Sequence, residues 1–342
     1  MIDFRYHLVS LVAVFLALAV GIVLGAGPLK DPIGATLTQS VQQLRNDRDA
    51  LNQQLKTAQA GLDSRDAFIT EMEHGLVADQ LGGRSVVLVT LPGADVDAVK
   101  PLTQAIIDAG GKVTGRIDVQ NGWVDPGSRA AREQAVRTIT ASLGGDTGTT
   151  ASPSQPTPQA STATGTASSF ADAAQLLARA VVTTELSSSE KSDAAEKTVL
   201  DGLGRAGLIE VNGDTPGRAT QAVLLVPGVA QLVHGAAPSP TPTVSVDPAM
   251  PWLALASALD AASTGTVVVG PASSAATGGV LAAVRAQPQL ASTLSTVDTG
   301  GTPMGDVTTV FALREQQLGE AGNYGFADGA SAPVPSAAAG GS

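Results

Sequence analysis

The most apolar stretch of the chain lies near its N-terminus. No Asp, Glu, Lys or Arg occurs between Arg5 and Lys30, and residues 8–27 alone give twenty mostly apolar positions. At ~1.5 Å per residue, a helix of this length spans ~30 Å, the thickness of a bilayer core. A cleaved signal peptide is the alternative, since small residues occur near position 25. However, the apolar run is longer than the ~7–15 residues of such a peptide. We therefore predict an uncleaved membrane anchor within residues 1–29.

Small residues form one stripe along this predicted membrane helix. They recur every four residues and end in a GxxxG step, and such stripes let two helix backbones approach closely in lipid. Basic residues are few on both sides of the helix, so counting them gives a weak signal for its orientation in the membrane. The orientation is therefore inferred from the rest of the chain. Its acidic, Ser/Thr/Pro-rich composition favours a single-pass protein of the cell membrane with a cytoplasmic N-terminus and residues 30–342 outside. The predicted helix-packing stripe consists of Ala13, Ala17, Gly21 and Gly25.

A heptad pattern follows the anchor. Asp31-Pro32 is typical of a helix start, because the aspartate caps the helix and proline suits its first turn. From Leu37 onward the spacing alternates between four and three residues, which predicts a coiled-coil helix of ~60 Å within residues 30–82. Ten of the twelve seam positions are apolar, and the other two are arginines. The seam consists of Leu37, Val41, Leu44, Arg48, Leu51, Leu55, Ala58, Leu62, Arg65, Ile69, Met72 and Leu76.

The seam of this coiled coil is imperfect. Arg48 and Arg65 lie on it, and with Val41 as an a position no g and e pair of a parallel homodimer has opposite charges. Homodimerisation therefore lacks its usual electrostatic support. Three arrangements remain open: self-association, a heterotypic coil with a partner that supplies carboxylates, and packing of the helix on its own domain. Met72 and His74 are interpreted as helix residues, not metal ligands.

The pattern changes after Gly82-Gly83 to alternating strands and helices. Repeated units of strand, Pro/Gly turn and helix predict an α/β domain with a mainly parallel sheet at 83–326. Low-complexity stretches at 144–169 and 235–248, and the tail 327–342, are predicted to be disordered, because Ser, Thr, Pro and Gly cannot bury enough apolar surface. Strands are predicted at 86–90, 113–119, 222–226 and 266–269, and a helix at 94–109.

Composition excludes several functions. The chain has 342 residues with no Cys, three His and four Met, so a soft-metal site or a Cys nucleophile has few residues to use. A net charge of -11 argues against nucleic-acid binding, which requires a basic face.

Ligands of open parallel sheets bind outside the carboxyl ends of the strands, which directs attention to three turns at 91–93, 227–228 and 270–271. These turns contain none of the common catalytic or phosphate-binding motifs. Asp95 and Asp97 follow the first turn and are interpreted as helix caps. His234 has no second ligand or nucleophile near it in the sequence. We therefore predict no catalytic residues, no cofactor and no metal ligands, and a function that is not enzymatic.

Two segments carry a family resemblance. Residues 3–25 read DFRYHLVSLVAVFLALAVGIVLG, and residues 322–326 read GNYGF. The first resembles the opening of the actinobacterial MctB family, to which SteB-type proteins are related, and the order of anchor, coiled coil and α/β domain is similar too. The resemblance implies one of two roles. MctB is described as a copper-efflux channel of the envelope, whereas SteB-type members act at the septum with a membrane partner, SteA, and influence peptidoglycan hydrolysis during cell division.

The residues favour the second role. Copper sites use clusters of Cys, Met or His. A pore needs several spans or a closed barrel, whereas this sequence predicts one span. We therefore expect a membrane-anchored envelope protein that binds a protein partner through its coiled coil, SteA-like by resemblance, or forms a homo-oligomer. Copper transport or homeostasis is the alternative, and an enzyme at the strand ends would need a polar cluster near Pro92, Pro227 and Pro271. The histidines and methionines in question are scattered: His7, His74, His234, Met72, Met250 and Met304.

Overall fold

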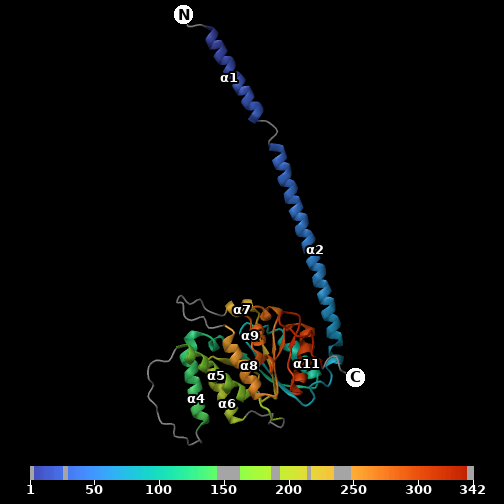
Figure 1. Ribbon diagram of the computed structural model, residues 1–342, viewed down its shortest axis with the longest axis vertical. Coiled ribbons are helices and arrows are strands. Elements are labelled where there is room, and N and C mark those ends of the chain that lie inside the picture. Colours follow the sequence, from blue (N-terminus) through green and yellow to red (C-terminus); the bar gives the residue numbers. More distant parts are fainter. Residues whose placement is uncertain are drawn as a thin grey trace. The chain divides into compact units, whose positions relative to one another are not determined.

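A computed structural model of the chain describes residues 4–25, 30–144, 162–185, 193–213, 217–234 and 248–336 (Figure 1). The chain divides into two compact units, Met1–Arg65 and Asp66–Ser342. The parts of the predicted inserts and tail at 145–161, 235–247 and 337–342 lie outside the described residues.

The first unit contains one helix and most of a second, which ends in the second unit. α1 (Phe4–Gly25) is followed by α2 (Lys30–Val77), a single helix of 48 residues. Within α1, Tyr6–Gly25 is long and apolar enough to cross a membrane, judged by length and composition. The predicted apolar N-terminal helix and long second helix are therefore confirmed.

A seven-stranded sheet forms the centre of the second unit. Its strand order is β3-β2-β1-β4-β5-β6-β7, and every pairing is parallel except that of β3 with β2. The mainly parallel α/β fold is therefore confirmed. The strands are β1 (Ser85–Thr90), β2 (Lys112–Val119), β3 (Ile209–Asn212), β4 (Gln221–Leu225), β5 (Thr266–Val269), β6 (Ser295–Val297) and β7 (Asn323–Tyr324).

Helices cover both faces of the sheet (Figure 1). α3 (Val99–Asp108) and α11 (Pro303–Gln317) pack on one face, and the other face is covered mainly by α5 and α8, with α4, α6 and α9 around them. The helices on this second face are α4 (Arg129–Leu143), α5 (Thr162–Val181), α6 (Ala194–Arg205), α8 (Met250–Ala262) and α9 (Val280–Arg285). Two further short helices are α7 (Val229–His234) and α10 (Pro288–Ala291). The described residues of this unit also form three short 3₁₀ helices: η1 (Asn121–Trp123), η2 (Pro126–Ser128) and η3 (Ala272–Ala275).

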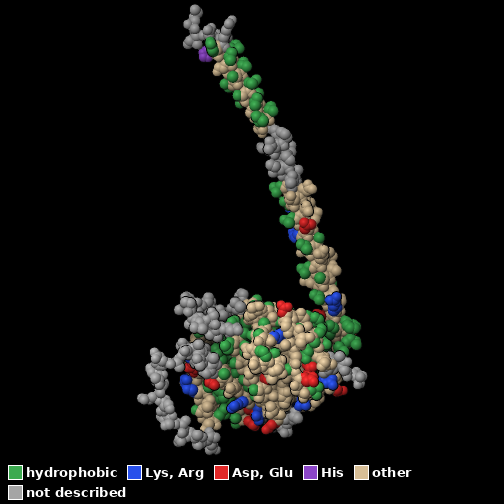
Figure 2. All heavy atoms as spheres, viewed as in Figure 1, with side chains coloured by type: hydrophobic (Ala, Val, Ile, Leu, Met, Phe, Trp, Pro, Cys, Tyr) green, Lys and Arg blue, Asp and Glu red, His purple; other side chains and the backbone are tan. Residues whose placement is uncertain are grey.

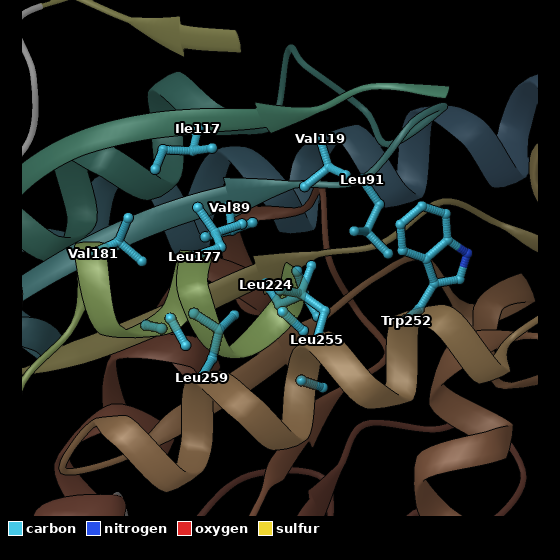
Figure 3. Close-up of a cluster of buried hydrophobic side chains, with 14 of the residues drawn as sticks. Val89, Leu91, Ile117, Val119, Leu177, Val181, Leu224, Trp252, Leu255 and Leu259 are labelled. Carbon is cyan, nitrogen blue, oxygen red and sulfur yellow. The ribbon is translucent and has the colours of Figure 1, made fainter. Parts of the chain in front are cut away.

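Alternate side chains of the central strands enter two separate cores. On β1, Val86 and Leu88 point to the α3 and α11 face, while Val87 and Val89 point to the α5 and α8 face. Because both faces are buried, the strands are nearly continuous runs of β-branched and aliphatic residues, as parallel strands usually are. Figure 3 shows the second core, in which α5 and α8 contribute Leu177, Val181, Trp252, Leu255 and Leu259.

The C-terminal end of α2 belongs to the first of these cores. Ile69 packs against it and Val77 is fully buried in it, while Asp66 and Glu73 on the same helix face are partly buried. This spacing of three or four residues places all four on one side of the helix. The part of α2 that lies in the second unit is therefore docked by one face.

The structure differs from the predicted disordered tail at residues 327–336. Gly325 and Ala332 are joined by an N–H to carbonyl bond of 3.0 Å, and Ser331 donates its N–H to Asn323. Polar backbone groups of this segment thus find partners along β7, although its composition is poor in apolar residues.

Two helix starts also differ from the sequence prediction. α3 begins at Val99 instead of residue 94, because residues 94–98 form turns after β1. α5 begins at Thr162, inside the predicted insert 144–169. The amphipathic run from Phe170 extends backward as helix through residues 162–169, two of which are alanines, which are good helix formers.

Candidate functional site

A crevice of about 430 Å³ lies at the carboxyl ends of β1, β4, β5 and β6. All three turns singled out from the sequence contribute to it, and the loop after β6 adds two glycines. Its size falls within the range of small-molecule sites. The lining consists of Gly93, Asp95, Ala98, Leu102, Leu225, Val226, Pro227, Gly228, Val269, Gly270, Pro271, Ser273, Gly300, Gly301 and Asp306.

Asp306 is the buried acid of this crevice. It lies in the first turn of α11 and is 5% exposed. Its carboxyl group makes no hydrogen bond or ion pair with the part of the chain that the structure describes. Burial, and then the charge of Glu73 on α2, raise the pKa of Asp306 from 3.8 to about 8. The side chain is therefore mostly neutral at pH 7.

Asp95 lies at the mouth of the same crevice. It is exposed, and its Oδ1 accepts the N–H of Asp97 at 3.0 Å. Any side chain at Gly301 would place its Cβ 3.5 Å from Oδ2 of Asp95, so the loop after β1 reaches the loop after β6. The predicted capping role is wrong, because the cap position of α3 is Ala98, with no side-chain hydrogen bond.

The predicted seam lies on α2 with most of its apolar side chains exposed, and Figure 2 shows hydrophobic groups along this helix. Leu44 is 71% and Leu51 is 64% exposed. Arg48 pairs with the neighbouring Asp49 at 2.7 Å, whereas Arg65 has no ion pair with any described residue. The seam therefore stays a prediction, with its apolar stripe accessible.

The docked face and the seam of α2 differ at its C-terminal end. Only Ile69 belongs to both, while Met72 and Leu76 remain 47% and 45% exposed. Packing of the helix on its own domain therefore uses a second face and leaves the seam open. The membrane stripe of Ala13, Ala17, Gly21 and Gly25 is likewise exposed, and its pairing stays a prediction.

The described residues contain no group of three or more His, Cys, Asp or Glu that could hold a metal. His74 lies on exposed α2 with Nδ1 3.6 Å from Oδ2 of Asp108. His234 ends α7, and its side chain lies outside the described residues. Met72, Met250 and Met304 lie on three different helices.

The GNYGF segment, residues 322–326, packs against a buried ion pair between Arg285 and Asp298. Asp298, directly after β6, binds Arg285 Nη2 at 3.0 Å and accepts the N–H groups of Phe326 and Ala327 at 2.9 and 3.1 Å. A Cβ at Gly325, where φ is +123°, would lie 1.9 Å from Oδ1 of Asp298. The two segments of the family resemblance thus have structural counterparts: the first forms the apolar helix α1, and the second surrounds the Arg285–Asp298 pair.

Sequence reasoning missed Asp306 and the Arg285–Asp298 pair. Asp306 follows a short strand and a Gly-Gly turn, which is a recognisable site position in a parallel sheet. Its strand, β6, has three residues and was too short to detect.

The described residues thus form an N-terminal helix long and apolar enough to cross a membrane, followed by an α/β domain with a crevice at the strand ends. Residues 1–335 match the family described as "Copper transport outer membrane protein, MctB". The chain belongs to the MctB family. Similar relatives include proteins named "Copper transporter MctB" from Mycobacterium tuberculosis and Mycobacterium bovis, each 28% identical over 333 residues, which cover 96% of this chain and 98% of the relative. The relative of the same name from Mycobacterium leprae is 29% identical over 336 residues, with the same coverage. These names describe a transport protein and not an enzyme.

Proposed function

We propose that this protein is a single-pass, non-enzymatic envelope protein that binds a protein partner through the seam of α2. The N-terminus lies in the cytoplasm and the α/β domain outside. The exposed apolar seam is the observation that carries the proposal. Covering side chains such as Leu44 and Leu51 with a second helix would remove their apolar surface from water, which lowers the free energy of the complex.

Charge favours a partner other than a second copy. Two copies anchored in one membrane run parallel, so Arg48 would face Arg48 and Arg65 would face Arg65. Like charges at such positions are destabilising, since each buried charge then lacks a counterion. A helix that presents carboxylates opposite these two arginines removes that cost. Such a helix would be SteA-like in the sense of the family resemblance, and the role would be in cell-envelope or septal function.

Capture from membranes tests the proposal. Tagged full-length protein is isolated from gently solubilised membranes as wild type, as Leu51→Asp on the seam, and as Ala50→Asp next to it but off the seam. We expect Leu51→Asp to lose the partner and Ala50→Asp to keep it. A second, differently tagged copy of the chain, expressed in the same cells, shows whether the captured protein is another copy.

Copper transport or homeostasis is the second candidate, and it rests on the names of the relatives. Metal content is therefore measured on the same samples. Stoichiometric copper together with equal partner capture by both α2 variants would reject the proposal and place copper first.

A further inference from the structure

The crevice at the strand ends has an acidic and apolar lining. Leu102, Leu225 and Val269 form apolar walls, while Asp95 lies at the mouth and Asp306 is buried. No Lys, Arg or His lies among the described lining residues. An anionic ligand would find no counterion there, and its transfer from water would be costly.

Asp306 is unusual for an acid in the first turn of a helix. Carboxylates at this position are stabilised by the helix dipole and commonly bind free N–H groups. Here the carboxyl group has no described partner, and the N–H of Gly305 is bound instead by the hydroxyl of Thr302 at 3.1 Å. Burial raises the pKa of Asp306 although it lies in the first turn of α11, so the helix itself gives no reason for a buried acid at this place.

A metal ion fits this crevice poorly. Metal sites in proteins use three or more protein ligands or several oxygen donors, and two carboxyl groups are available here. Apolar walls leading to a buried acid suit a ligand with an alkyl stem and a cationic head, as lysine side chains have.

We propose that the crevice binds an alkylammonium group, with the stem between Leu102, Leu225 and Val269 and the cationic head at Asp306, and with Asp95 closing the mouth. The group is either a lysine side chain of a protein or a free amine. This site is separate from the seam of α2 and does not depend on the function proposed for it.

Binding is coupled to ionisation of Asp306. The titratable groups around it are Glu73 on α2, Asp95 in the loop after β1, and, beside Glu73, Asp108 at the end of α3, with His74 near Asp108. A cation prefers the ionised carboxylate. Because the pKa of Asp306 is raised, affinity should increase from pH 6.5 to 8.5, by at most about tenfold per pH unit. The ammonium group remains charged over this range.

Calorimetric titration of the detergent-solubilised full chain tests the site. The probes are Nα-acetyl-L-lysine amide, n-pentylamine and, as the uncharged match, Nα-acetyl-L-norleucine amide. We expect the charged probes to bind and the norleucine probe to bind at least about tenfold more weakly. Tighter binding of the lysine amide would indicate that the natural ligand is a lysine side chain of a protein. Tighter binding of pentylamine would indicate a free amine.

Three variants locate the binding. Asp306→Asn should weaken the charged probe about tenfold or more and remove the pH dependence, and Asp95→Asn should weaken it several-fold. Asp97→Asn, next to Asp95 but outside the lining, should bind as wild type does. Equal binding of the lysine and norleucine probes, or unchanged binding by Asp306→Asn, would overturn the proposal. Competition by millimolar Mg²⁺ or Ca²⁺ with tighter binding of the metal alone would overturn it as well.

Discussion

The buried carboxyl group of Asp306 should make the stability of the domain depend on pH. In the unfolded chain its pKa is near 3.8, and in the folded domain burial and Glu73 raise it to about 8. Between these values the folded protein keeps a proton that the unfolded chain has lost. Since the unfolded state binds fewer protons, the free energy of unfolding falls as pH rises from about 4 to about 8, and it levels off above.

The shift in the pKa of Asp306 sets an upper limit on this change in the free energy of unfolding. A rise in pKa from 3.8 to about 8 corresponds to about 6 kcal/mol at ~1.4 kcal/mol per pH unit. At most about 4 kcal/mol of this falls between pH 5 and pH 8, and because the crevice is open to solvent the actual change should be smaller than this limit. Asp306→Asn keeps the size of the side chain and removes its ionisation, so it should lose this part of the pH dependence.

Urea unfolding of the full-length protein measures the effect. Both tryptophans, Trp123 and Trp252, are buried in the α/β domain, so their fluorescence reports its unfolding. The matched control is Asp172→Asn, an exposed position on α5. We expect wild type and control to lose stability together from pH 5 to 8 while Asp306→Asn loses less. Parallel curves for all three proteins would refute the reasoning, because Asp306 would then titrate alike in both states.

Three further predictions use the same unfolding measurement. Asp298→Ala leaves Arg285 buried without its counterion and removes the acceptor of two N–H groups, so it should cost about 3–5 kcal/mol, whereas Asp172→Ala should cost little. Gly325→Ala should cost more than about 2 kcal/mol because its Cβ would overlap Asp298, while Gly82→Ala has open space and should change stability by less than about 1 kcal/mol. Val77→Ala should cost about 2 kcal/mol and Leu76→Ala close to nothing, since the first is fully buried and its neighbour is exposed; equal losses would contradict the two faces assigned to α2.

Strands with continuous apolar runs were predictable from the sequence, and short ones were not. Runs such as Thr266–Val269 are β-branched and bounded by glycine, which is why their positions agree with the structure. β6 and β7 have three and two residues, too few for a periodic signal. They are held by tertiary contacts instead, including Asn323 Oδ1, which accepts the hydroxyl hydrogen of Thr296 at 2.9 Å.

The place of the candidate site was predictable, but its chemistry was not. Turns with Pro and Gly after strands mark the carboxyl edge of a parallel sheet, and the crevice lies there. The burial of Asp306 depends on how α2, α3 and α11 pack together, and this packing cannot be predicted from a local sequence pattern. The same holds for Asp95, where a helix cap was expected and an aspartate turn is found.

The two edges of the sheet limit how this protein can associate. At one edge β3 runs antiparallel and has four residues, with Glu210 exposed on it. At the other edge β7 has two residues, and the segment around Ala332 already occupies its backbone groups. Short, charged or covered edges resist the addition of a foreign strand. A partner of this domain is therefore expected to contact side-chain surfaces of helices and loops, because extension of the sheet by a foreign strand is disfavoured at both edges. The same edges should resist strand-to-strand aggregation of the chain at high concentration.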